Sequence, residues 1–352
     1  MPNIFLLTME SPDFNGGIGQ YIRSLVAMRP DIKVIIITKS SYRQIISSIN
    51  FLISATVTLH RQTINQTTLQ VHHILPVGTV VWFLSLFGGP KYEIFLHGLD
   101  FYLATSNFKK RLLAKIILKR ATRVVVNSNA LALTVESFSG KTPLVIYPPL
   151  TEFFSNHLAP QLSSILEPGP DHNLSPSPST QIQLITVSRL VAHKGHDRVL
   201  KLIASGGIFS NLHYHIVGEG PSEENLKNIV QELQLNNQVT FHGTVSNEDL
   251  LTLYRQSDIF IMPTIVIPTG REGFGMVYLE AASQALPVIA SNLSGVNEAV
   301  VDNQTGRLIN SDAELSLVLA EFIENPTLRM ALGQAGRQRV LDFLPARVFA
   351  KL

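Results

Sequence analysis

The chain has 352 residues, of which 45% are hydrophobic and 15% are charged. That length suits two domains of ordinary size, and the composition is that of a folded protein and excludes a disordered one. The absence of cysteine excludes disulfides and thiolate metal sites and favours a reducing compartment. The N-terminus, Met1-Pro2-Asn3-Ile4, lacks the basic region of a signal peptide, so we expect a cytoplasmic protein.

The net charge of +2 is unevenly distributed along the chain. Residues 1–155 contain 15 Lys and Arg against 7 Asp and Glu, whereas the remainder contains 13 against 19. No acidic residue lies between Asp100 and Glu136. That interval instead holds seven basic residues: Lys109, Lys110, Arg111, Lys115, Lys119, Arg120 and Arg123. This concentration of positive charge predicts an anionic partner for the first half.

In chain order, the first half alternates short apolar runs with helix-like stretches. We expect buried strands at residues 4–8, 34–38, 79–83, 94–97, 124–127 and 144–147. The longest apolar stretch, residues 74–87, is too short to span a bilayer and contains a proline and a glycine. We therefore expect this stretch to be a buried element.

Two short segments of the first half are candidate ligand contacts. Gly16 and Gly17 follow the first expected strand and open a helix, where glycines let backbone N–H groups approach a phosphate closely. The spacing does not fit the dinucleotide fingerprint, and a plain helix-start loop is the alternative. His97 closes a strand on the side where doubly wound folds bind ligands, and a structural histidine is the alternative.

The second half begins after a change of composition. Residues 156–180 are rich in proline and serine and predict a linker or an exposed loop. Strands are then expected at 182–187, 214–217, 239–241, 259–262, 288–290 and 307–309, with helices at 222–235 and 247–256. Strand–helix alternation predicts two doubly wound α/β domains, 1–155 and 181–335, with a ligand site in the cleft between them. A C-terminal helix is expected at 336–352, and packing against the N-terminal domain is one alternative for it.

Two cations follow the first strand of the second half. Arg189 comes directly after the strand, in Ser188-Arg189-Leu190, and Lys194 follows five residues later. At the carboxyl end of a strand, two such cations can clamp a diphosphate and stabilise it as a leaving group. Solvated surface charge is the alternative for both residues.

The most informative segment is Glu272-Gly273-Phe274-Gly275-Met276-Val277-Tyr278-Leu279-Glu280. A helix that starts at these glycines offers backbone N–H groups and its positive dipole end, which suit a phosphate. Glu272 and Glu280 are good acceptors for sugar hydroxyls, so the segment predicts a nucleotide-sugar ligand. A surface helix with two unrelated glutamates is the alternative. No metal site is expected, because the sequence has no Asp-x-Asp pair and no His-x-x-x-His.

Seven motifs in order closely resemble glycosyltransferase family 4, whose members are retaining enzymes of the GT-B fold. They are Gly-Gly-x-Gly, His-Gly-x-Asp, Ser-Arg-Leu…Lys-Gly, Val-Gly-Glu-Gly-Pro, Phe-His-Gly-x-Val, Glu-Gly-Phe-Gly…Glu-Ala and Ser-Gly-x-x-Glu. The resemblance implies two Rossmann-like domains facing a central cleft. It also implies metal-independent, retaining transfer of a hexose-like sugar from a nucleoside diphosphate sugar to a hydroxyl acceptor, either a glycan or a lipid-linked glycan. No other cofactor is implied.

The resemblance implies which residues contact the phosphates of the donor. Arg189 and Lys194 are expected to bind the donor diphosphate. Backbone N–H groups around Gly16–Gly17 and Phe274–Gly275, with Gly273 before them, are expected to help.

The remaining roles concern the sugar and the nucleoside. Glu272 is expected beside the reacting carbon of the transferred sugar, and Glu280 on the ribose hydroxyls. Val245 is expected next to the nucleobase, and His97 is expected to approach the sugar from the N-terminal domain.

Alternative functions stay open at this point. A nucleotide-sugar epimerase, a sugar phosphorylase or an inactive nucleotide-sugar-binding protein has the same fold. Arg111, Lys115, Lys119 and Arg123 recur every four residues, which on a helix gives a basic stripe beside apolar residues. This stripe suits reversible docking on an anionic membrane, on its inner face, and a solvated helix face is the alternative. No nucleic-acid partner is expected, because aromatic residues are sparse there.

Overall fold

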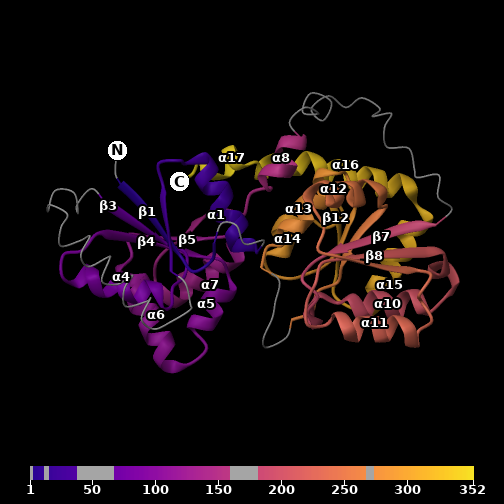
Figure 1. Cartoon of the computed structure of the whole chain (residues 1–352), viewed down its shortest axis with the longest axis horizontal. Helices are drawn as coiled ribbons and strands as arrows, with labels where there is room; N and C mark the ends of the chain where they lie inside the picture. The colour runs from indigo at the N-terminus through magenta and orange to yellow at the C-terminus, as the bar shows by residue number, and fades with distance from the viewer. Residues whose placement is uncertain (1–2, 12–15, 38–66, 159–180, 267–272) are drawn as a thin grey trace. The chain divides into compact units, whose positions relative to one another are not determined.

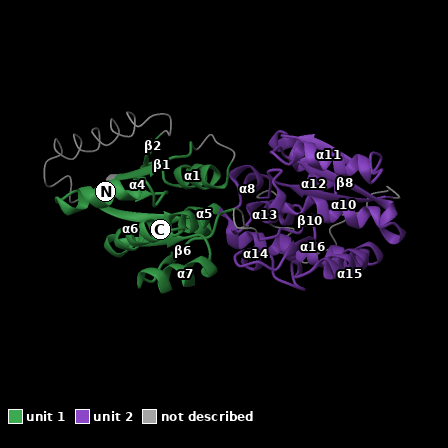
Figure 2. Cartoon of the chain, turned by 90° about the horizontal axis from the view of Figure 1, so that it is seen from below, with its two compact units in different colours: residues 1–149, 345–352 green, residues 150–344 purple. Residues whose placement is uncertain are grey.

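The computed structural model describes residues 3–11, 16–37, 67–158, 181–266 and 273–352 (Figure 1). The chain divides into two compact units, which Figure 2 colours separately. Unit 1 comprises residues 1–149 and 345–352, and unit 2 comprises residues 150–344. Each unit has its own six-stranded sheet with only parallel pairings among the described strands. The doubly wound α/β class predicted from the sequence is therefore confirmed in each unit.

The sheet of unit 1 has the strand order β2-β1-β3-β4-β5-β6. Its strands are β1 (Asn3–Thr8), β2 (Lys33–Ile36), β3 (Thr67–Val71), β4 (Lys91–Leu96), β5 (Arg123–Val126) and β6 (Leu144–Val145). Its helices are α1 (Gly17–Met28), α4 (Val77–Leu86), α5 (Leu99–Ala104), α6 (Phe108–Arg120), α7 (Asn129–Ser139) and α17 (Pro345–Phe349). The strand order reverses between β1 and β3, and doubly wound sheets bind ligands at such a switch point.

Helices cover both faces of this sheet. On one face, Leu7, Ile94 and Val124 pack with side chains of α4, α5, α6 and α7. On the other face, the neighbouring residues Leu6 and Phe95 pack with α1 and α17. Alternate residues of each strand thus enter two separate apolar clusters, which explains why these strands read as continuous apolar runs.

One predicted strand of unit 1 is wrong. Residues 79–83, expected as a strand, lie inside helix α4. A short apolar run does not distinguish a buried strand from a buried helix. The helix turns Val77, Gly78 and Val81 to the core, and a Cβ on Gly78 would lie 3.4 Å from Ile117 of α6.

The strand that takes this place in the sheet is β3, which the sequence analysis missed. Its sequence, TTLQV, contains no apolar run, because two of its buried residues, Thr67 and Gln70, are polar. Gln70 donates a hydrogen bond to the Glu93 carboxylate of β4 at 3.3 Å.

The sheet of unit 2 has the order β12-β11-β10-β7-β8-β9, with its switch point between β10 and β7. Its strands are β7 (Ile182–Val187), β8 (Leu212–Val217), β9 (Val239–Gly243), β10 (Ile259–Met262), β11 (Val288–Ser291) and β12 (Gly306–Ile309). All six were predicted to within two residues at either end. The predicted linker lies outside the described residues from 159 onward, and its first residues belong to α8.

Helices again lie on both faces of the sheet. They are α8 (Glu152–Leu158), α10 (His196–Ala204), α11 (Glu223–Glu232), α12 (Asn247–Gln256), α13 (Met276–Ser283), α14 (Val296–Ala299), α15 (Asp312–Glu324) and α16 (Pro326–Val340). Short 3-10 turns are η2 (Ala192–Lys194), η3 (Gly207–Asn211) and η4 (Leu341–Phe343). Leu184 and Ile261 pack with α10, α11 and α15, whereas Phe260 contacts Tyr254 of α12 and Tyr278 of α13 on the opposite face.

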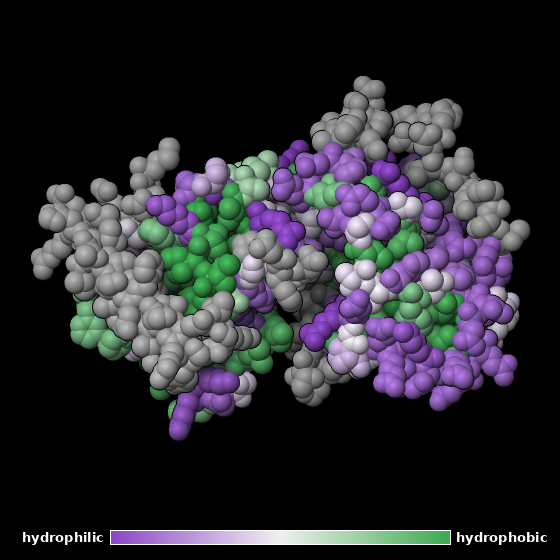
Figure 3. Space-filling model, in the orientation of Figure 1, coloured by the Kyte–Doolittle hydropathy of each residue, from purple (hydrophilic) through white to green (hydrophobic). Residues whose placement is uncertain are grey.

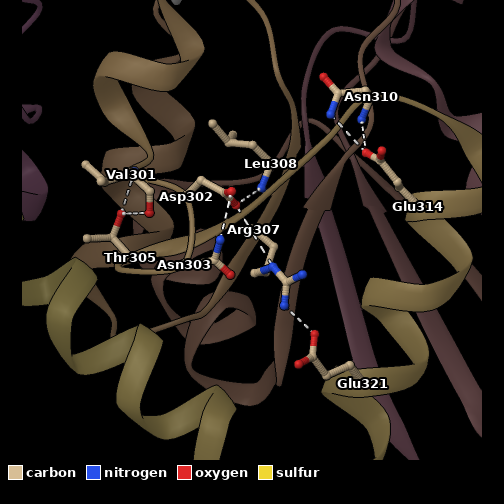
Figure 4. A network of polar contacts seen from close by, with 9 residues as sticks. All are labelled: Val301, Asp302, Asn303, Thr305, Arg307, Leu308, Asn310, Glu314 and Glu321. Carbon is tan, nitrogen blue, oxygen red and sulfur yellow. Dashed lines mark hydrogen bonds and ion pairs between the residues drawn. The ribbon is translucent and has the colours of Figure 1, made fainter.

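A polar network fixes the outer edge strand β12 (Figure 4). Asp302 accepts a hydrogen bond from the Leu308 N–H at 2.8 Å, and its carboxylate lies 4.0 Å from the Arg307 guanidinium. Arg307 also forms an ion pair with Glu321 of α15. Glu314 accepts from the Asn310 N–H at 2.6 Å. The edge strand is therefore tied both to the turn before it and to the helix after it.

Candidate functional site

The turns after β7 and β8 are in direct backbone contact. Gly218 has φ +120°, and a Cβ there would lie 2.0 Å from the carbonyl oxygen of Ser188. A Cβ on Gly220 would lie 2.3 Å from the carbonyl oxygen of Leu190. Both positions therefore require glycine. The glycines of the Val-Gly-Glu-Gly-Pro motif therefore let the turn after β8 pack directly against the turn that carries Arg189.

Two further glycines bring the neighbouring turns to the same edge of the sheet. A Cβ on Gly195, which has φ +77°, would lie 2.1 Å from the carbonyl oxygen of Pro263 after β10. A Cβ on Gly295, with φ +94°, would lie 2.0 Å from the carbonyl oxygen of Gly273. The segments after β7, β8, β10 and β11 consequently meet around the switch point.

Arg189 and Lys194 lie on one short segment at this edge. Arg189 is exposed directly after β7, and Lys194 is half-buried at the end of η2. The Leu190 N–H donates to the Glu219 carbonyl at 2.9 Å, and the Ile265 N–H donates to the His193 carbonyl at 2.8 Å. These bonds anchor the segment on both sides, so the backbone that carries the two cations is fixed before any ligand binds.

A buried hydrogen-bond chain supports this segment from below. The Thr186 hydroxyl donates to the Ile261 carbonyl, so Tyr214 must donate to Thr186, at 2.8 Å. Nδ1 of His196 lies 3.0 Å from the Tyr214 hydroxyl, and its Nε2 lies 3.0 Å from the Ser188 hydroxyl. Burial, reinforced by Lys194, lowers the pKa of His196 to about 4. A neutral His196 therefore fixes the hydroxyl of Ser188, the residue before Arg189.

Helix α13 begins at the glycine-rich segment. Gly275 is its N-cap, with φ +81°, and the Tyr278 N–H donates to the Gly275 carbonyl at 3.0 Å. Phe274 is buried and its ring lies 5.5 Å from that of Phe343. The predicted helix start at Gly273–Gly275 is therefore confirmed. Glu272 lies outside the described residues, so its place beside the sugar stays a prediction.

Glu280 is a buried carboxylate. It is only 5% exposed, and the Tyr254 hydroxyl of α12 donates to its Oε2 at 3.4 Å. Burial raises the pKa of Glu280 to about 7, although the bond from Tyr254 lowers it. The alternative of a surface glutamate is wrong for this residue. A buried carboxylate with one weak donor has the capacity to accept hydrogen bonds from ligand hydroxyls.

Val245 lies in the turn between β9 and α12, half-buried. This turn is held from β8, because the Glu219 carboxylate accepts from the Thr244 N–H at 3.2 Å. Ser246 then caps α12 by accepting from the Asp249 N–H at 3.1 Å. Glu219 therefore organises two turns of the site, through its carbonyl and its carboxylate. In the sequence, Glu219 was noted only as a member of the Val-Gly-Glu-Gly-Pro motif.

The candidate loop of unit 1 is described from Gly16 onward. Gly16 is the N-cap of α1 in an extended conformation, and its carbonyl accepts from the Gln20 N–H at 3.0 Å. Gly17 is exposed in the first turn of the helix. The chain therefore has a helix N-terminus after β1, beside the switch point of this sheet. Residues 12–15 lie outside the described part.

His97 is held rigidly at the end of β4. Its N–H donates to Asp100 at 2.9 Å, and its carbonyl accepts from the Asn127 side chain at 3.0 Å. Burial, with a contribution from His73, lowers the pKa of His97 to about 3. The imidazole is therefore neutral at physiological pH and can donate or accept only one hydrogen bond at each nitrogen.

His72, directly after the missed strand β3, sets the state of His97. Its Nδ1 lies 3.1 Å from Nε2 of His97, while its own Nε2 is buried without a hydrogen-bond partner among the described residues. A buried unpaired N–H is rarer than an unpaired acceptor, which favours a proton on Nδ1 of His72. His97 then accepts at Nε2 and carries its own proton on Nδ1. Tyr21 of α1 packs its ring edge-on against His97, with centroids 5.1 Å apart.

The predicted basic stripe is wrong at its last member. Arg123 lies in β5 and forms an ion pair with Glu93 at 3.0 Å. The helix that carries the other three cations, α6, ends at Arg120. The stripe therefore belongs to α6 alone.

Two kinds of feature are absent from the described residues. They contain no group of three His, Asp or Glu side chains arranged to hold a metal ion. They also contain no helix with the length and apolar character needed to cross a bilayer.

Comparison with known proteins identifies the class. Residues 170–339 match the family described as glycosyl transferases group 1. The GDP-mannose-dependent alpha-(1-6)-phosphatidylinositol monomannoside mannosyltransferase of Mycobacterium tuberculosis is 30% identical over 206 residues. That alignment covers 53% of this chain and 54% of the relative, so the chain spans about half the length of the curated relatives it matches. These likenesses bear out the resemblance to glycosyltransferases that the motifs predict.

Solved structures extend the likeness of fold to nearly the whole chain. The sucrose-phosphate synthase of Thermosynechococcus elongatus has a TM-score of 0.75 at 18% identity, covering 99% of this chain and 97% of its own. Anabaena HepE in complex with UDP-glucose has a TM-score of 0.73 at 17% identity, covering 98% and 96%. The predicted fold, GT-B, is therefore confirmed.

The burial of Glu280 leads to a prediction about stability. Its folded-state pKa of about 7 exceeds the ordinary glutamate value of 4.5, so the native state favours the protonated carboxyl. The stability linked to this group is full below the unfolded pKa and is lost as pH rises through the folded pKa. Because glutamine cannot ionise, Glu280→Gln should match the parent near pH 4.5 and exceed its unfolding free energy by about 3 kcal/mol near pH 8.

Urea denaturation at both pH values measures this difference. Glu232→Gln, at an exposed position of α11, is the matched control and should show no comparable change between the two pH values. An equal effect of Glu280→Gln at acid and alkaline pH would contradict the argument.

Proposed function

We propose that this chain is a retaining, metal-independent glycosyltransferase that moves a hexose-like sugar from a nucleoside diphosphate sugar to a hydroxyl acceptor. One observation supports the proposal: a single edge of the unit 2 sheet collects the Arg189–Lys194 segment and the start of α13, the helix that carries buried Glu280. Cations and helix N–H groups suit a diphosphate, and a buried carboxylate suits sugar hydroxyls. The names of the relatives, which are those of glycosyl-transferring enzymes, support the same activity.

In the proposed reaction, the bond between the anomeric carbon and the diphosphate breaks. Arg189, Lys194 and the first N–H groups of α13 neutralise the charge that develops on the departing diphosphate. The acceptor oxygen forms the new bond to the anomeric carbon on the face that the diphosphate leaves, its proton passes to the departing diphosphate oxygen, and no protein nucleophile takes part. This retaining course rests on the family resemblance.

The other candidates contact the rest of the donor in this proposal. Glu280 binds the ribose hydroxyls, Val245 lies next to the base, and Glu272 contacts the sugar beside the reacting carbon. His97 of unit 1 contacts the sugar, and its Nδ1 proton, set by His72, makes it a hydrogen-bond donor there.

The donor and acceptor classes are drawn from the relatives. The mycobacterial relative is named for GDP-mannose and a phosphatidylinositol mannoside, and HepE was solved with UDP-glucose. We propose a nucleoside diphosphate hexose as donor and a glycan or a lipid-linked glycan as acceptor. A lipid-linked acceptor would place the protein in the cytoplasm, peripherally on the inner face of the membrane, with α6 toward the lipid.

Lys194 gives the most direct test of the leaving-group argument. Lys194→Ala should lower kcat by about 100- to 1000-fold, the usual loss for one preorganised electrostatic partner. The control is Lys201→Ala on the neighbouring helix α10, where the exposed lysine pairs with Asp197 at 2.9 Å. A Lys194→Ala enzyme with more than half of the parent turnover, measured with UDP-glucose or GDP-mannose, would remove Lys194 from the mechanism.

Substitution of the two glutamates should change different steady-state constants. Glu280→Gln should act mainly on donor KM, because contacts to the ribose form equally in the ground and transition states. Glu272→Gln should act mainly on kcat, because contacts beside the reacting carbon tighten as the glycosidic bond breaks. Near-parental kinetics for both variants would end the nucleotide-sugar assignment of this segment.

Chelation tests metal independence. With Arg189 and Lys194 available to neutralise the diphosphate, the transfer rate should survive an excess of EDTA within about twofold. Loss of activity on chelation, with recovery on adding Mn²⁺ or Mg²⁺, would show that a metal ion supplies this charge instead.

A further inference from the structure

Helix α6 presents an apolar face to solvent. Phe108, Leu112 and Ile116, spaced four residues apart, follow one side of the helix and are 79%, 53% and 39% exposed. The opposite side, with Ile117 and Leu118, is fully buried in the core of unit 1. A surface helix of a globular protein normally turns polar residues outward, so this second apolar face is left without a described partner.

The neighbouring helices extend this face. Leu99 and Leu103 of α5, which packs against α6, are both exposed. Phe83 and Phe87 at the end of α4 are exposed as well, with ring centroids 5.1 Å apart. Figure 3 shows hydrophobic surface at the left of the molecule, where Figure 1 places α4. The expectation that residues 74–87 form a wholly buried element is therefore wrong at its C-terminal end.

Basic side chains surround and interleave this apolar face. All six lie on α6 and all are exposed: Lys109, Lys110, Arg111, Lys115, Lys119 and Arg120. Lys115 and Lys119 lie on the same side of the helix as Leu112 by its 3.6-residue period. Arg120 donates to the Ser85 hydroxyl at 2.7 Å and to the Ser85 carbonyl at 2.8 Å, which ties the end of α6 to α4. No acidic residue occurs anywhere in α6.

We propose that this face of α4, α5 and α6 docks on an anionic phospholipid bilayer, with Phe108 and Leu112 inserted among the acyl chains. Lysines with long stems reach the phosphate level while their methylenes line the apolar side chains. The cations are then attracted to acidic headgroups. The inference rests on the proposed peripheral location and adds which residues enter the lipid.

Charge complementarity decides between lipid and a protein partner. A second copy of the chain would bring the same six cations against one another, and like charges in contact oppose association. An acidic bilayer offers negative charge over a continuous plane and apolar chains below it. That arrangement matches a face in which basic and apolar residues alternate along one helix.

Co-sedimentation with vesicles tests the proposal on the full chain. Binding should be strong to phosphatidylcholine vesicles containing phosphatidylglycerol, weak to pure phosphatidylcholine, and reduced in high salt, where the Debye length falls to about 3 Å at 1 M. The double variant Phe108→Ser/Leu112→Ser should bind the acidic vesicles at least about tenfold more weakly. The matched control, Leu317→Ser/Met330→Ser, removes two exposed apolar side chains of unit 2 and should bind like the parent.

A fluorescence measurement covers the case in which the double variant fails to fold. The chain has one tryptophan, Trp82, so Phe108→Trp in a Trp82→Phe background places a single reporter on the docking face. Its emission should shift to the blue on acidic vesicles and be quenched by brominated phospholipid. Absence of both changes would overturn insertion.

Other outcomes also overturn the proposal. They are equal binding to neutral vesicles, undiminished binding by the double variant, or salt-resistant self-association that Phe108→Ser abolishes. Thermal shift with UDP-glucose and GDP-mannose separates this inference from the proposed activity. Donor binding without vesicle binding would contradict only the membrane-docking proposal. Vesicle binding without donor binding would contradict the proposed transferase activity.

Discussion

Backbone contact between strand-end turns is the constraint on which the candidate site depends. Gly195, Gly218, Gly220 and Gly295 each lie so close to a neighbouring carbonyl oxygen that a Cβ would overlap it. These contacts draw together the ends of strands that are distant in sequence but adjacent in the sheet. The cations after β7 and the helix start after β10 consequently share one edge, on either side of the switch point.

Burial explains the unusual protonation of single groups in each unit. A buried polar group lies in a medium that disfavours charge. Glu280 therefore has a raised pKa, and His196 and His97 have lowered ones. Neutral, hydrogen-bonded groups of this kind keep their orientation and cost little to desolvate further when a ligand arrives. The charged partners, Arg189 and Lys194, are instead left at the accessible rim.

The sequence predicted the repeating strands of unit 2 because each is short, apolar and bounded by turn residues. It misassigned α4 because a helix buried along one side and apolar along the other has no amphipathic period to detect. It missed β3, and with it His72, because the polar residues of that strand are buried through hydrogen bonds such as that of Gln70. The glycine motifs were found, but their spatial partners, such as Pro263 for Gly195, are far away in sequence.

Helices α4 and α6 of unit 1 share an unusual pattern. Both α4 and α6 carry apolar residues on a buried side and again on an exposed side, so neither shows the single polar face expected of a helix in water. Such a pattern costs free energy in solution, because exposed Phe and Leu side chains gain nothing from hydration. A second apolar phase removes that cost. The pattern that led to the wrong assignment of α4 is therefore the same one that favours lipid contact on this face of unit 1.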